Sequence, residues 1–129
     1  MITRIKSGNK IFALLVDFKN LDEGTLPITS PSCSLQMLMM KRKREYVVKK
    51  HMHKKLPKYS KQPQEAVVVV KGELKAIIFD RKGNILAKKK VSEGQCLFMM
   101  DGGLEVKIAK NALVYEFKNG PYVEDKIPL

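Results

Sequence analysis

Apolar and polar residues alternate in short runs along most of this chain, and turn-forming residues separate the runs. Alternation with a period of two is typical of β-strands, whereas the longer spacing of an amphipathic helix is nearly absent. We expect strands at residues 35–40, 46–53, 65–71, 74–79, 85–91, 96–100, 104–109 and 112–118. Residues 11–18 fit a strand or a short helix, and residues 21–31 are predicted to form a loop. The pattern therefore predicts an all-β sandwich or barrel.

Size and composition fit one domain. The chain has 129 residues, of which 44% are hydrophobic. We divide it into an N-terminal segment and loop (1–33), a barrel (34–122) and a tail (123–129). The apolar run at 11–16 has about a third of the roughly 20 residues that cross a bilayer, so no membrane association is expected. No signal-peptide layout precedes it, and Cys33 and Cys96 lack metal-ligand spacing, so we expect a cytoplasmic protein with reduced thiols.

The net charge of +12 is concentrated in residues 41–61, here called the basic segment. The basic segment holds ten Lys or Arg residues and one acid, Glu45. Such a density can bind a polyanion through counterion release, or it can be a solvated surface. Nucleic-acid-binding proteins usually interleave aromatic residues for stacking, and the basic segment offers only Tyr46 and Tyr59. The sequence therefore does not favour a nucleic-acid partner.

Both histidines of the chain lie in the sequence His51-Met52-His53. On a strand their side chains would point the same way, and Glu65 on a neighbouring strand could join them. Two imidazoles and a carboxylate can take one face of a divalent metal and leave the other face open. The alternative is that His51 and His53 are surface residues of a lysine-rich edge. The spacing to Glu65 and then to Gly72 favours a metal or catalytic site.

These residues resemble a known motif, the first motif of the small cupins. Gly94, followed six residues later by Met100-Asp101-Gly102, is similar to the start of the second motif. The resemblance extends to WbuC-type cupin metalloproteins and related small cupins of unassigned activity, on the strings 35–36, 79–83 and 116–122. It implies a double-stranded β-helix, which is a jelly-roll barrel of two antiparallel sheets, with a metal inside and often a homodimer. It also implies that His51, His53 and Glu65 are metal ligands.

The fourth ligand position departs from the cupin pattern. Leu104 stands where cupins place a histidine, and a second alignment puts Glu105 there instead. Alternation along this strand places Leu104 in the core and Glu105 outward. Glu105 is therefore a possible fourth ligand that the alternation disfavours. A divalent ion (Zn, Fe, Mn or Ni) is the expected cofactor, and a metal-free protein is the alternative.

Three functions follow from these residues. The first is a metal-binding cupin that acts on a small polar or anionic metabolite, such as a sugar nucleotide of surface-polysaccharide metabolism. The second is a metal-free sugar-nucleotide isomerase in which His51 and His53 act as catalytic acid and base. The third is a non-enzymatic module that binds a small ligand or a polyanion through the basic segment.

Overall fold

The computed structural model describes residues 1–129 and contains ten β-strands. The strands are β1 (Ile2–Ser7), β2 (Lys10–Asp17), β3 (Gly24–Pro27), β4 (Leu38–Lys41), β5 (Glu65–Lys71), β6 (Glu73–Phe79), β7 (Ile85–Ser92), β8 (Gln95–Met99), β9 (Gly103–Ile108) and β10 (Leu113–Lys118). No segment forms a helix that could cross a bilayer. The prediction of an all-β fold is confirmed.

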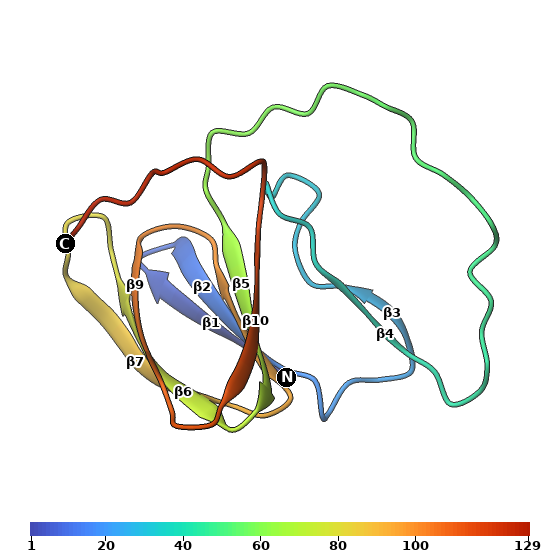
Figure 1. The fold of residues 1–129 in the computed structure, drawn as a ribbon, viewed down its shortest axis with the longest axis horizontal. Helices are drawn as coiled ribbons and strands as arrows, with labels where there is room; N and C mark the ends of the chain where they lie inside the picture. The colour runs from blue at the N-terminus through green and yellow to red at the C-terminus, as the bar shows by residue number, and fades with distance from the viewer.

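The strands form three antiparallel sheets. A main sheet has the order β1-β2-β8-β5-β10, a second sheet has the order β7-β6-β9, and β3 pairs with β4. The second sheet packs on one face of the main sheet, and the β3–β4 pair lies on the other side (Figure 1). The main sheet stays open, with β1 and β10 as its edges, so the strands do not close into a barrel.

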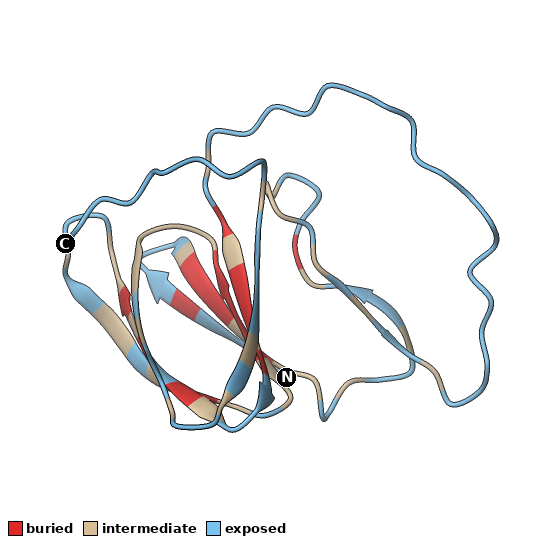
Figure 2. Cartoon of the chain, in the orientation of Figure 1, coloured by how far each residue is buried: buried red, intermediate tan, exposed pale blue.

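Burial explains why the central strands read as continuous apolar runs. On β5, Val67 and Val69 belong to the larger core between the two big sheets, whereas Ala66 belongs to the smaller core beneath β3 and β4. On β8, Leu97 and Phe98 divide between the same two cores. Successive side chains of a strand point to opposite faces, so a strand covered on both faces is apolar at every position. Figure 2 shows this burial on the strands of the main sheet.

The strands from residue 65 onward match their predicted positions to within a residue or two. Gly83, in the turn between β6 and β7, has a φ of 87°, a left-handed conformation that favours glycine. The strand at 35–40 begins later than predicted, at Leu38. The short edge strands β1 and β3 were not predicted, because β1 has few apolar residues and β3 contains Gly24 and Pro27.

The prediction of a strand at residues 46–53 is wrong. These residues lie in a long connection between β4 and β5 that contains no strand. Residues 43–61 are exposed throughout, and Figure 2 shows this connection looping away from the sheets. Lysine pairs on both sides of the histidines leave no apolar face that could pack on a sheet. The basic segment is therefore a solvent-exposed loop that begins at the last residue of β4.

Candidate functional site

The two histidines lie together on the exposed basic segment. The ring centroids of His51 and His53 are 5.2 Å apart, and the ring planes meet at 83°. The Nδ1 atom of His51 donates a hydrogen bond of 2.7 Å to the carbonyl oxygen of Lys49. That bond leaves Nε2 of His51 as the unprotonated nitrogen when the ring is neutral. The pair is thus accessible to solvent, outside any enclosed cavity.

Glu65 has different neighbours. It is the first residue of β5 and lies opposite Lys118 of β10. The Nζ atom of Lys118 is 4.0 Å from the Glu65 carboxylate and 3.4 Å from the Glu116 carboxylate. Burial, together with the adjacent Glu116 carboxyl, raises the pKa of Glu65 to about 7. The hydrogen bond that Glu116 accepts from Glu65 lowers the pKa of Glu116. The two carboxyls therefore share a proton beside an ammonium group.

The predicted metal ligands are not assembled into one centre. No group of three or more His, Cys, Asp or Glu side chains is placed to hold a metal ion. Leu104 packs against the larger core, as the alternation predicts, and Glu105 is exposed on the outer face of β9 opposite Ile77. The arrangement of these donors therefore does not fit a His-His-Glu metal site.

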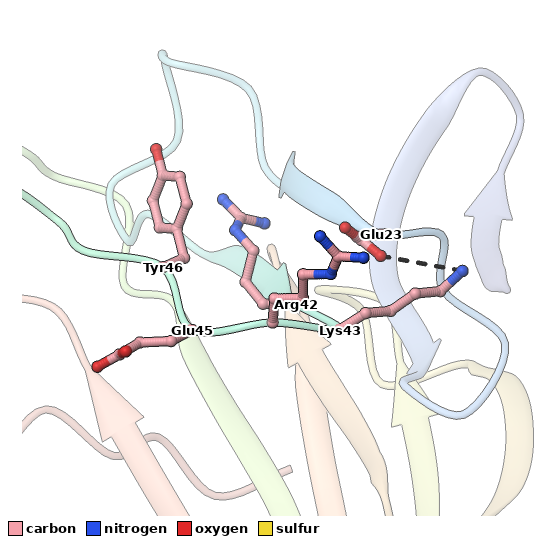
Figure 3. Close-up of a pocket in the computed structure, with 6 residues that line it drawn as sticks. Glu23, Arg42, Lys43, Glu45 and Tyr46 are labelled. Atoms are coloured by element: carbon pink, nitrogen blue, oxygen red, sulfur yellow. Dashed lines mark ion pairs between the residues drawn. The ribbon is translucent and has the colours of Figure 1, made fainter.

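The start of the basic segment is held in place by neighbouring groups (Figure 3). The guanidinium carbon of Arg42 lies 4.2 Å from the centroid of the Tyr46 ring, and its Nη2 donates to Thr25 of β3 at 2.6 Å. Lys43 lies 4.0 Å from Glu23. Glu23, Arg42, Lys43 and Tyr46 line an open hollow of about 430 Å³. Arg42 is thereby oriented, while its charge has no carboxylate partner.

The far end of the basic segment is tied to the sheets by Asp101, which the sequence analysis named only as part of the string similar to the second cupin motif. The carboxylate of Asp101 accepts hydrogen bonds from Lys10, from Arg81 at 2.7 Å and from the Gly102 amide at 2.7 Å. It also accepts a bond of 3.3 Å from Gln62, just after the basic segment. Burial alone would raise the pKa of Asp101, but these donors hold it well below its usual range.

A second cationic surface was missed by the sequence reasoning. The outward residues of β7, β6 and β9 include four lysines, and we call this surface the lysine face: Lys75, Lys88, Lys90 and Lys107. Alternation within each strand predicts which residues point outward, but it does not predict which strands are neighbours. The lysine face arises only when β6 pairs with both β7 and β9.

Comparison with protein-family models, with curated proteins and with solved structures finds no match to this chain. The cupin resemblance therefore stays a hypothesis based on the quoted motifs. The features of the structure that bear on function are the two cationic surfaces, the histidine pair and the carboxyl pair.

Proposed function

We propose that this protein binds single-stranded nucleic acid through contacts between the basic segment and phosphate groups. The observation behind the proposal is an exposed loop with ten cationic side chains and one acid. Of these cations only Lys43 lies within ion-pair distance of a carboxylate, that of Glu23. A cationic loop without carboxylate partners binds a polyanion by releasing the counterions that are condensed on the polyanion.

The placement of the two tyrosines supports the same ligand. The sequence counted against nucleic acid because it offers so few aromatic residues. Tyr59 is 95% exposed and Tyr46 is 60% exposed, and both lie on the basic segment among its cations. An exposed aromatic ring can stack on any base, which suits binding without sequence preference. Two exposed rings on a loop without β-strands suit a flexible single-stranded nucleic acid, whose bases can stack on them.

The test is fluorescence anisotropy of a labelled oligonucleotide across a range of salt concentrations. A loop variant carries Lys54→Gln, Lys55→Gln and Lys58→Gln and is compared with the unmodified chain. Loss of three phosphate contacts should reduce the slope of log affinity against log salt by about 2. A control variant with His51→Ala and His53→Ala should bind as the unmodified chain does.

Two results would overturn the proposal. Binding that does not depend on salt, or that the loop variant leaves unchanged, would show that the basic segment is only a solvated surface. Binding that requires a divalent metal and disappears in the histidine variant would show that the histidines hold the site. Heparin as a competitor measures how much of the affinity comes from charge alone.

A second candidate function depends on the histidine pair. Two solvent-accessible imidazoles with centroids 5.2 Å apart can hold a divalent ion together or exchange protons with a bound sugar nucleotide. The cupin resemblance favours this candidate, and the surrounding lysines would attract a phosphorylated metabolite. Elemental mass spectrometry on the unmodified chain and on the histidine variant tests it. Near-stoichiometric metal in the unmodified chain, absent from the histidine variant, would support a metal site at the histidine pair. If the unmodified chain takes up no metal after loading, only the metal-free isomerase form of this candidate remains.

A further inference from the structure

The strand register of the second sheet places three lysines in one row. Lys75 of β6 lies directly opposite Lys90 of β7 on one side and Lys107 of β9 on the other. Opposite residues of antiparallel neighbours point to the same face, and adjacent strands lie about 4.8 Å apart. The row therefore brings three ammonium groups onto one face, across about 10 Å of sheet.

Little within the protein balances this charge. Glu73 lies 2.9 Å from Lys90, and neither Lys75 nor Lys107 lies within ion-pair distance of a carboxylate. In the next row of the sheet, Ile77 of β6 lies between Lys88 of β7 and Glu105 of β9. Glu105 forms no ion pair with Lys88 or with any other cation. Like charges placed directly opposite each other destabilise a sheet. An anion bound across the row would remove that repulsion.

The shape and chemistry of the lysine face narrow the class of anion. Its side chains line a shallow hollow of about 370 Å³, whose lining includes Ile77 and Ala76 but no aromatic residue. Without an aromatic ring the hollow has nothing on which a base could stack. Several ammonium groups around an apolar floor match a compact ligand with multiple phosphates, because each phosphate oxygen can accept from a different lysine.

We propose that the lysine face is a binding site for a soluble oligophosphate, with Lys75 at its centre. This site differs from the basic segment, which lies beyond β3 and β4 on the other side of the main sheet (Figure 1). Lys75, Lys90 and Lys107 contact the phosphates, and Lys88 extends the site to the next row. Glu105 lines the same hollow and opposes the anion. The proposal does not depend on nucleic-acid binding by the basic segment.

Calorimetric titration with tripolyphosphate tests the site. A face variant carries Lys75→Gln, Lys88→Gln and Lys107→Gln, and the loop variant defined above serves as its control. Each variant loses three lysines from a net charge of +12, so the two are matched in net charge. We expect the face variant to raise the Kd for tripolyphosphate about tenfold or more and the loop variant to change it less than about threefold. For the oligonucleotide we expect the reverse: the loop variant should weaken binding and the face variant should change it little.

Glu105→Gln provides a test by gain of affinity. Removing this carboxylate from the hollow should lower the Kd for tripolyphosphate about two- to fivefold. This result would hold even if the face variant folded poorly, which circular dichroism would show. Equal loss of tripolyphosphate binding in both triple variants would reduce the effect to net charge and overturn the proposal. Loss of oligonucleotide binding alone in the face variant would also overturn it, because the face would then serve nucleic acid.

Discussion

The basic segment and the lysine face are both cationic and exposed, but their charges are arranged by different constraints. In the basic segment the cations after Lys41, the last residue of β4, follow one another along a loop that lacks strand pairing. On the lysine face the cations come from three strands, and backbone hydrogen bonds fix them side by side. A loop can spread like charges apart by changing its backbone, whereas a sheet cannot.

That difference gives the two surfaces different ligands and different energetic consequences. The basic segment can follow a long flexible polyanion, and its charges impose little repulsion on the fold. The lysine face offers a fixed row that suits a compact anion, and the sheet bears the repulsion when no anion is present. Charge count alone therefore does not describe either surface.

Limited trypsin digestion should separate the two regions most strongly. Trypsin cuts after Lys and Arg, and both regions expose these residues. Cleavage requires an unpaired backbone, so we expect cuts within 41–61 at least about a hundredfold faster than cuts in β6, β7 or β9. Mass spectrometry of early digestion products measures this ratio. Early cuts after Lys75 or Lys88 would show that the second sheet opens as readily as the loop.

Asp101→Asn should weaken the junction between the basic segment and the sheets. The change removes the charge that accepts hydrogen bonds from Lys10 and Arg81, and we expect a loss of about 2 kcal/mol in the free energy of unfolding. Because the pKa of Asp101 is depressed in the folded state, its contribution is present above its unfolded pKa and is lost as the pH falls. Urea unfolding at pH 7 and pH 3 checks both statements. A variant as stable as the unmodified chain at pH 7 would contradict them.

Glu65→Gln tests the point where the chain leaves the loop region and enters β5. The folded pKa of Glu65 is raised to about 7, so its contribution to stability is full below its unfolded pKa and is lost as the pH rises towards 7. Glutamine has no such loss and can still donate to Glu116. We expect the variant to be more stable by on the order of 1 kcal/mol at pH 8 and nearly unchanged at pH 4.5. Thermal unfolding across this pH range measures the difference, and a constant difference would contradict the shared proton.

Lys75→Gln should give the smallest effect, yet its sign distinguishes the two cationic regions. Removing the central lysine of the row should raise the free energy of unfolding by about 0.5 kcal/mol in the absence of anions. Lys58→Gln in the basic segment should leave it unchanged, because that side chain is exposed on a loop. Thermal unfolding in low-salt buffer compares them. A destabilising Lys75→Gln would show that the lysine stem contributes more by packing than its charge costs.

The sequence alone determined the all-β class and the strands from residue 65 onward, because their apolar patterns are strong and short glycine turns bound them. It also predicted that Leu104 faces inward and Glu105 outward, since alternation is a local property of a strand. It misplaced a strand at 46–53, where Val47 and Val48 suggested pairing and no neighbouring surface was available to bury them.

Only the tertiary structure decided which residues meet. Glu65 meets Glu116 and Lys118 because β10 pairs with β5, whereas the histidines 51 and 53 stay on the loop. The lysine row exists because β6 pairs both with β7, which follows it in the chain, and with β9, from which β7 and β8 separate it. Local sequence fixes the direction of a side chain within a strand, but strand neighbours and register depend on burial of the whole core.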